Sequence, residues 1–151
     1  IMEHLNEMLC SDLPDDKFVT MVLGKISNCG RFITISFAGH GPAYHWIDKK
    51  NKFEETIIRN LPLGVISNYT GNEEVIEIQK NDFLLIASDG FYEWPNAKGE
   101  IFGNDRFIEG ASKLTHLPNE LFLASLHKQA SEWSKNILPE DDLSALIIRS
   151  T

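Results

Sequence analysis

The sequence predicts an α+β fold, in which antiparallel strands pack with helices and do not alternate with them in βαβ units. Most of the expected strands follow one another through short turns, which is typical of hairpins. Two segments with helical periodicity lie together in the last third of the chain, and an apolar strand follows them. The 151 residues are 42% hydrophobic, which is enough for one core, so we expect a single domain over residues 1–151.

The first part of the chain predicts one short helix followed by hairpin strands. Leu5, Met8 and Leu9 recur at helical spacing, so residues 1–11 should form an amphipathic helix that stops before Pro14. Alternating or β-branched residues then predict strands at 18–26, 31–37, 43–48 and 53–56.

The remainder of the chain contains the most apolar strand and two longer helices. Residues 57–72 carry turn residues and should form an ordered loop, whereas residues 74–78 alternate as a strand. Phe83 to Ala87 is an almost continuous apolar run, which is typical of a strand buried on both faces. The later segments predict a helix at 105–115, a helix from Pro118 in its first turn to about Lys135, and a strand at 143–149.

Charge, hydropathy and cysteine content disfavour several classes of protein. Fourteen Lys and Arg residues against 22 Asp and Glu give a net charge of −8, which repels nucleic acid. The apolar runs are too short to cross a bilayer and no secretory leader opens the chain, so we expect a cytoplasmic protein without membrane contact. Cys10 and Cys29 have no metal-ligand spacing; reduced thiols are favoured, with a disulfide as the alternative.

Two acidic segments adjoin buried strands and suggest a metal site. Asp89 follows the run that ends at Ala87, and Asp141 and Asp142 precede the strand that begins at Leu143. If the two strands are central and antiparallel, these carboxylates meet at one edge of the sheet. Mg²⁺ and Mn²⁺ prefer such oxygen ligands. An Asp-Gly turn and a solvated Asp-Asp loop explain the same residues without a metal, and the spacing leaves both interpretations open.

Five blocks in the sequence together resemble the SpoIIE/RsbU-like branch of PP2C-type (PPM) metal-dependent serine/threonine phosphatases. Residues 81–93 resemble the family segment in which Gly-Asp, an apolar strand and Asp-Gly-x-x-Glu follow one another, although Asn81 replaces the Gly and Ser88 replaces a Thr. The other four blocks, in the order of the family, are residues 18–21, 38–42, 61–64 and 141–144.

The resemblance implies a PP2C-like antiparallel β-sandwich flanked by helices, with two Mn²⁺ or Mg²⁺ ions at one edge. It implies that Asp89 and Asp141 are metal ligands and that Asp142 and Gly90 lie directly beside them. The ions would activate a water for attack on a phosphoserine or phosphothreonine. The implied partner is a phosphorylated regulatory protein of the anti-sigma-factor antagonist type, in a bacterium, and a homodimer through the helix at residues 1–11 is compatible with the family.

One family motif is absent from the sequence. The first metal motif of the family, an Asp-Gly pair upstream of the first helix, has no counterpart here, so we expect an N-terminally truncated domain whose isolated chain is inactive and binds metal weakly. The alternative is a non-catalytic PP2C-like binding or sensory module.

Overall fold

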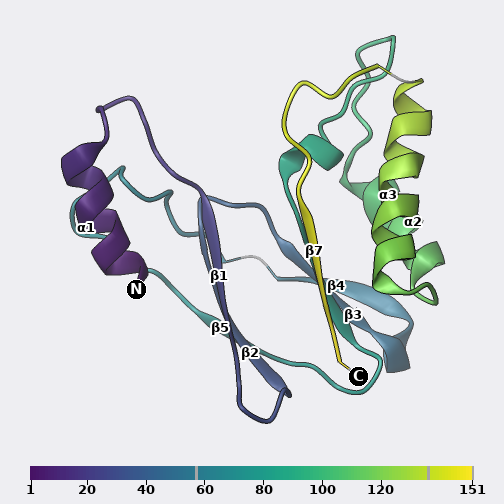
Figure 1. The fold of residues 1–151 in the computed structure, drawn as a ribbon, viewed down its shortest axis with the longest axis horizontal. Helices are drawn as coiled ribbons and strands as arrows, with labels where there is room; N and C mark the ends of the chain where they lie inside the picture. The colour runs from purple at the N-terminus through teal and green to yellow at the C-terminus, as the bar shows by residue number, and fades with distance from the viewer. Residues whose placement is uncertain (57, 136, 151) are drawn as a thin grey trace. The chain divides into compact units, whose positions relative to one another are not determined.

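The computed structural model describes residues 1–56, 58–135 and 137–150, which divide into two compact units (Figure 1). The first unit comprises Ile1–Pro42, Thr56–Asp82 and Ser150–Thr151, and the second comprises Ala43–Glu55 and Phe83–Arg149. Each unit therefore combines segments that lie far apart in the sequence.

The first unit contains one helix and a three-stranded antiparallel sheet. The helix α1 spans Met2–Asp12, and the strands β1 (Met21–Ile26), β2 (Phe32–Ala38) and β5 (Glu74–Glu77) lie in the order β1-β2-β5. Strands β1 and β2 pair as the predicted hairpin. A small core beside α1 contains Met2, Ala38, Leu63 and Tyr69.

The second unit contains a four-stranded antiparallel sheet in the order β4-β3-β6-β7. Its elements are β3 (Ala43–Ile47), a 3₁₀ turn η1 (Asp48–Lys50), β4 (Lys52–Thr56), β6 (Phe83–Ala87), a 3₁₀ turn η2 (Asp89–Phe91), α2 (Asn104–Leu114), α3 (Asn119–Ser134) and β7 (Ala145–Arg149). Figure 1 shows α2 and α3 beside this sheet, where Phe107 and Leu126 pack in one core with Phe83 and Leu85.

Strand β6 lies between β3 and β7, and all five of its residues are buried. The continuous apolar run at Phe83–Ala87 is explained by this central position, because a strand with neighbours on both edges and cover on its faces has no side chain left for solvent. The prediction of a buried central strand is confirmed.

The structure confirms the α+β class and the order of the elements, with shifts of a few residues at their ends. Strand β1 begins at Met21 rather than at residue 18, and β7 begins at Ala145 rather than at 143. Pro118 is the N-cap of α3 and precedes its first turn. Between residues 58 and 72 there is no helix and no strand, as expected of the loop; residue 57 lies outside the described residues.

Two smaller predictions can also be compared with the structure. Cys10 and Cys29 are both free thiols, so the disulfide alternative does not hold. Among the helices of the described ranges, none has the length and apolar character that crossing a membrane requires.

Candidate metal centre at the end of strands β6 and β7

The two acidic segments leave the second sheet at the same end. Strands β6 and β7 pair antiparallel, with Ala87 opposite Ala145, so the end of one lies beside the start of the other. The ladder continues one step further, because the Ser88 amide donates to the Ser144 carbonyl oxygen at 2.8 Å. Ser88 and Ser144 are thus directly hydrogen-bonded. Asp89 comes directly after Ser88, and Asp142 lies shortly before Ser144.

The Ser88 side chain also joins the two segments. Its hydroxyl donates to the Asp142 carbonyl oxygen at 2.9 Å and accepts from the Ser144 amide at 2.9 Å. The hydroxyl thus serves as donor and acceptor at once, which a serine side chain can do. It fixes the backbone on the β7 side of Asp142.

Gly90 allows the close approach of these segments. It is buried in the turn η2, and a Cβ added to it would lie 2.6 Å from the Asp142 carbonyl oxygen, a separation that side-chain carbons do not tolerate. The backbone of Asp142 therefore occupies the space that any side chain at position 90 would need. The structure brings together Gly90 and Asp142, two of the four residues predicted for the site.

The Asp89 and Asp141 carboxylates are both exposed and each accepts a hydrogen bond from the following amide. The Asp89 Oδ1 atom accepts from the Gly90 amide at 3.1 Å, and the Asp141 Oδ1 atom accepts from the Asp142 amide at 2.8 Å. These local contacts orient each carboxylate and leave its remaining lone pairs to solvent or to a ligand.

The carboxylates of these residues are the right type of ligand for a divalent metal, but there are too few of them. Carboxylate oxygens are the ligands that Mn²⁺ and Mg²⁺ prefer. However, the residues that the structure describes contain no group of three or more His, Cys, Asp or Glu side chains able to hold an ion. The described side chains therefore do not form a complete metal centre.

Two aromatic residues, Tyr92 and Trp94, follow Asp89 in the chain, and Tyr92 lies near its charge. Burial raises the pKa of Tyr92 to about 12, and the nearby charges of Asp89, Glu93 and Glu55 act in the same direction, so the phenol stays neutral near pH 7. The indole Nε1 of buried Trp94 donates to the Ile137 carbonyl oxygen at 2.8 Å. This bond attaches the segment leading to Asp141 to the chain that follows η2.

The sequence did not predict the long-range hydrogen bonds that Ser88 and Trp94 make beside the candidate centre. Ser88 was visible as a replacement within a motif, but its partners lie 54 and 56 residues away. Trp94 packs in the core, and its indole also donates to the Ile137 carbonyl oxygen, 43 residues away. Neither long-range contact leaves a periodic signal in the sequence.

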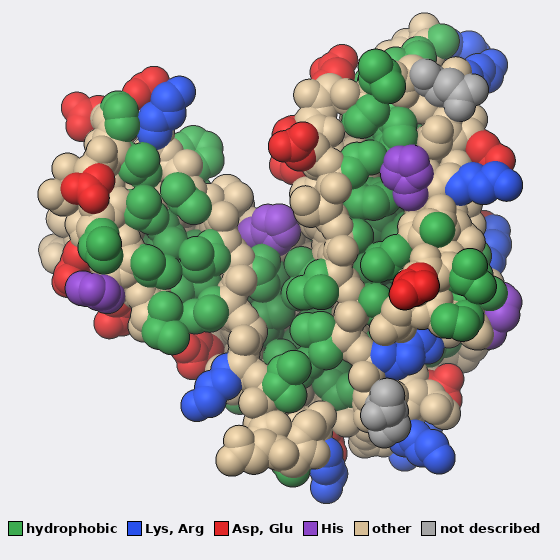
Figure 2. Space-filling model, viewed as in Figure 1, with side chains coloured by type: hydrophobic (Ala, Val, Ile, Leu, Met, Phe, Trp, Pro, Cys, Tyr) green, Lys and Arg blue, Asp and Glu red, His purple; other side chains and the backbone are tan. Residues whose placement is uncertain are grey.

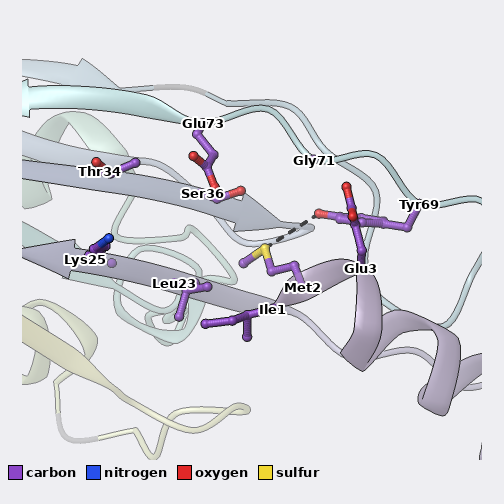
Figure 3. A pocket seen from close by; sticks show the side chains of 11 residues that line it. Ile1, Met2, Glu3, Leu23, Lys25, Thr34, Ser36, Tyr69, Gly71 and Glu73 are labelled. Carbon is purple, nitrogen blue, oxygen red and sulfur yellow. Dashed lines mark hydrogen bonds between the residues drawn. The ribbon is translucent and has the colours of Figure 1, made fainter.

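Each unit also has a cavity, and none of the four predicted residues lines either one. The cavity in the first unit measures about 670 Å³ and lies beside the start of α1, as Figure 3 shows. Its lining mixes apolar side chains with charged ones, including Lys25 and Glu73. The cavity in the second unit measures about 370 Å³ and is lined by Tyr44, Phe53, Glu55, Asn104, Asp105, Ile108 and Glu109.

The model of the family described as Stage II sporulation protein E (SpoIIE) matches residues 1–151. The phosphoserine phosphatase RsbU of Bacillus subtilis (strain 168) is 24% identical over 99 residues, which cover 66% of this chain and 30% of RsbU.

Solved structures show the same fold at low sequence identity. The SiaA-PP2C domain of Pseudomonas aeruginosa superimposes with a TM-score of 0.83 at 14% identity, over 99% of this chain and 58% of that one. A structure of the PP2C phosphatase domain of SpoIIE from Bacillus subtilis, with a fragment of its regulatory domain, superimposes with a TM-score of 0.78 at 18% identity. The match covers 99% of this chain and 43% of that one. The chain thus spans under a third of RsbU and about half of the two structures.

Proposed function

This chain belongs to the SpoIIE family of PP2C-type phosphatase domains of regulatory proteins, and from that premise we propose that it forms the C-terminal part of a serine/threonine phosphatase domain. Residues 1–151 would lie within that one domain. We propose hydrolysis of a phosphoserine or phosphothreonine on a partner protein. The similarity to RsbU, which is named a phosphoserine phosphatase, supports this substrate class.

The placement of the acidic residues carries the proposal. The antiparallel pairing of β6 with β7 brings the segments of Asp89 and Asp141 to one end of the sheet. We propose these two residues as ligands of Mn²⁺ or Mg²⁺, with Asp142 and Gly90 supporting them through their backbone contact. PP2C phosphatases are metal-dependent, and a bound metal of this type supplies an activated water for attack on phosphorus.

The proposed partner is a phosphorylated regulatory protein of the anti-sigma-factor antagonist type, in the bacterial cytoplasm. The net charge of −8 argues against a nucleic-acid partner. A homodimer through α1 is also part of the proposal. Figure 2 shows hydrophobic side chains gathered around α1, and the Met8 side chain on this helix is 51% exposed.

One observation favours a second candidate, a non-catalytic PP2C-like binding or sensory module. Within the described ranges, no three acidic or other ligand side chains lie close enough together to hold a metal. A module that retains the fold and lacks the complete ligand set would bind a partner without hydrolysing it.

Activity measurements on the complete natural protein distinguish the two candidates. We expect Mn²⁺-dependent hydrolysis of p-nitrophenyl phosphate and of a phosphoserine peptide. Asp89→Asn and Asp141→Asn should each lower the rate at least about 100-fold, since a metal contributes several kcal/mol to the transition state. Asp105→Asn is the matched control, because Asp105 is an exposed carboxylate at the start of α2 in the same unit, and it should keep the wild-type rate.

A wild-type protein without activity, folded and supplied with Mn²⁺, would support the binding module instead. Activity that Asp89→Asn and Asp141→Asn leave unchanged would show that the metal ligands are assigned to the wrong residues.

A further inference from the structure

We infer that Ser88 is a positioning residue, whose hydroxyl fixes the segment carrying Asp141 and Asp142 relative to Asp89. The inference rests on the proposed function for the roles of Asp89 and Asp141. The positioning itself rests on contacts of Ser88 that need no metal and no substrate.

Three hydrogen bonds connect Ser88 to the start of the β7 segment. Its amide donates to the Ser144 carbonyl oxygen, and its hydroxyl accepts from the Ser144 amide and donates to the Asp142 carbonyl oxygen, all within 2.8–2.9 Å. The first bond is an ordinary extension of the ladder. The two hydroxyl bonds depend on the side chain and reach the backbone of Asp142 itself.

A second contact holds the other side of the acidic segment. Trp94 is 4% exposed, and its indole donates to the Ile137 carbonyl oxygen at 2.8 Å. The stretch between Ile137 and Ser144 is therefore attached at both ends to the chain around η2. Asp141 and Asp142 lie between the two attachments with exposed side chains.

The backbone sets the position of the Asp89 and Asp141 carboxylates relative to each other. Asp89 and Asp141 each bond the amide of their own neighbour, so these contacts do not define the distance between the two side chains. That distance depends on how the Asp142 backbone is held against η2. The Ser88 hydroxyl bonds this backbone, and Gly90 leaves room for it.

The first test measures the contact in the 151-residue chain, without metal. Ser88→Ala should speed native-state hydrogen exchange of the Ser144 amide about tenfold. The net loss of one hydrogen bond is worth about 1.4 kcal/mol, and that free energy corresponds to a tenfold change. Ser88→Thr keeps the hydroxyl and should restore slow exchange. Ser144→Ala is the matched control, because the backbone of Ser144 makes the contacts, and it should leave exchange unchanged.

The second test measures the effect of that contact on metal binding, with Mn²⁺ alone as the probe. In the complete protein, electron paramagnetic resonance should show Mn²⁺ affinity about tenfold weaker for Ser88→Ala and unchanged for Ser88→Thr and Ser144→Ala. All variants are measured well below their unfolding temperatures, so each one is folded during the titration. A loss of stability alone therefore would not weaken Mn²⁺ binding in Ser88→Ala. If Ser88→Ala does not fold, Ser88→Cys replaces it, because a thiol has similar size but is a weak donor and acceptor.

Unchanged Ser144 exchange in Ser88→Ala would overturn the contact. Faster exchange with unchanged Mn²⁺ affinity would overturn the positioning role, while leaving the phosphatase proposal intact. Loss of Mn²⁺ affinity in a protein that shows no phosphatase activity would support the positioning role and count against the proposed function. The two inferences therefore fail on different measurements.

Discussion

Gly90 illustrates how a single residue sets the spacing of the candidate centre. An added Cβ would lie 2.6 Å from the Asp142 carbonyl oxygen and 3.2 Å from the Leu143 Cδ2 atom. The first of these neighbours is backbone, which cannot rotate away as a flexible side chain can. A side chain at position 90 would therefore force the acidic segment away from η2.

We predict that Gly90→Ala destabilises the protein by about 1–3 kcal/mol, the usual cost of forcing extra volume into a packed site. The free energy of unfolding from urea titration measures this effect. Gly24→Ala is the control, because an added Cβ at Gly24 would meet only the Ile33 Cγ2 atom, at an ordinary 3.9 Å. Equal stabilities for the two variants would contradict the close contact between Gly90 and Asp142.

At the residue scale, the sequence pointed to two acidic residues as candidate ligands, which stays a prediction, and not to the contacts around them. Asp89 and Asp141 could be proposed because each adjoins a recognisable apolar strand, and the structure brings their segments to one end of the sheet. The hydroxyl bonds of Ser88 could not, because they depend on the register between β6 and β7 and on the path of the loop before Ala145. Register is decided by packing across the sheet, which periodicity along one strand does not report.

At the scale of elements, the second sheet and its helices depend on one shared core. Strand β6 contributes Phe83 and Leu85, and α3 contributes Phe122 and Leu126, to the same cluster. The rings of Phe83 and Phe122 meet edge to face, with centroids 5.5 Å apart. The position of the candidate centre at the end of β6 therefore depends on how α3 packs on this sheet.

Element boundaries show where local sequence signals are insufficient. The β-branched and aromatic residues from Phe18 onward predicted a strand from residue 18, but regular pairing with β2 begins at Met21, opposite Ala38. Val19 forms an isolated bridge to Leu63 instead. The strand therefore begins where a partner is present, and the partner cannot be identified from residues 18–26 alone.

We predict that Leu126→Ala in α3 lowers the free energy of unfolding by about 2–5 kcal/mol, because it leaves a cavity in the core. Leu126 is fully buried, whereas Leu121 on the same helix is 57% exposed. Leu121→Ala should therefore stay within about 0.5 kcal/mol of the wild type. Chemical denaturation of both variants tests the orientation of α3, and a larger loss for Leu121→Ala would contradict it.

At the scale of the whole molecule, the division into two units was not visible in the sequence. The chain passes from one unit to the other between residues 42 and 43, 55 and 56, 82 and 83, and 149 and 150. No linker rich in proline or glycine marks these points, because each one lies at or beside the end of a strand. Composition predicts linkers between consecutive domains, and these units are not consecutive.

The four residues proposed for the candidate centre all lie in the second unit. The Mn²⁺ affinity of the whole chain therefore depends on the ligands that this unit supplies. We predict that residues 1–151 alone bind Mn²⁺ more weakly than the micromolar range. Two carboxylates leave most of the coordination sphere to water, and such ions are usually held by one or two carboxylates together with substrate phosphates. Asp89→Asn should weaken the remaining binding further, whereas Asp105→Asn should not. Isothermal titration calorimetry of the three proteins measures this directly, and micromolar affinity in the wild-type chain would show that it holds a more complete ligand set than the described side chains form.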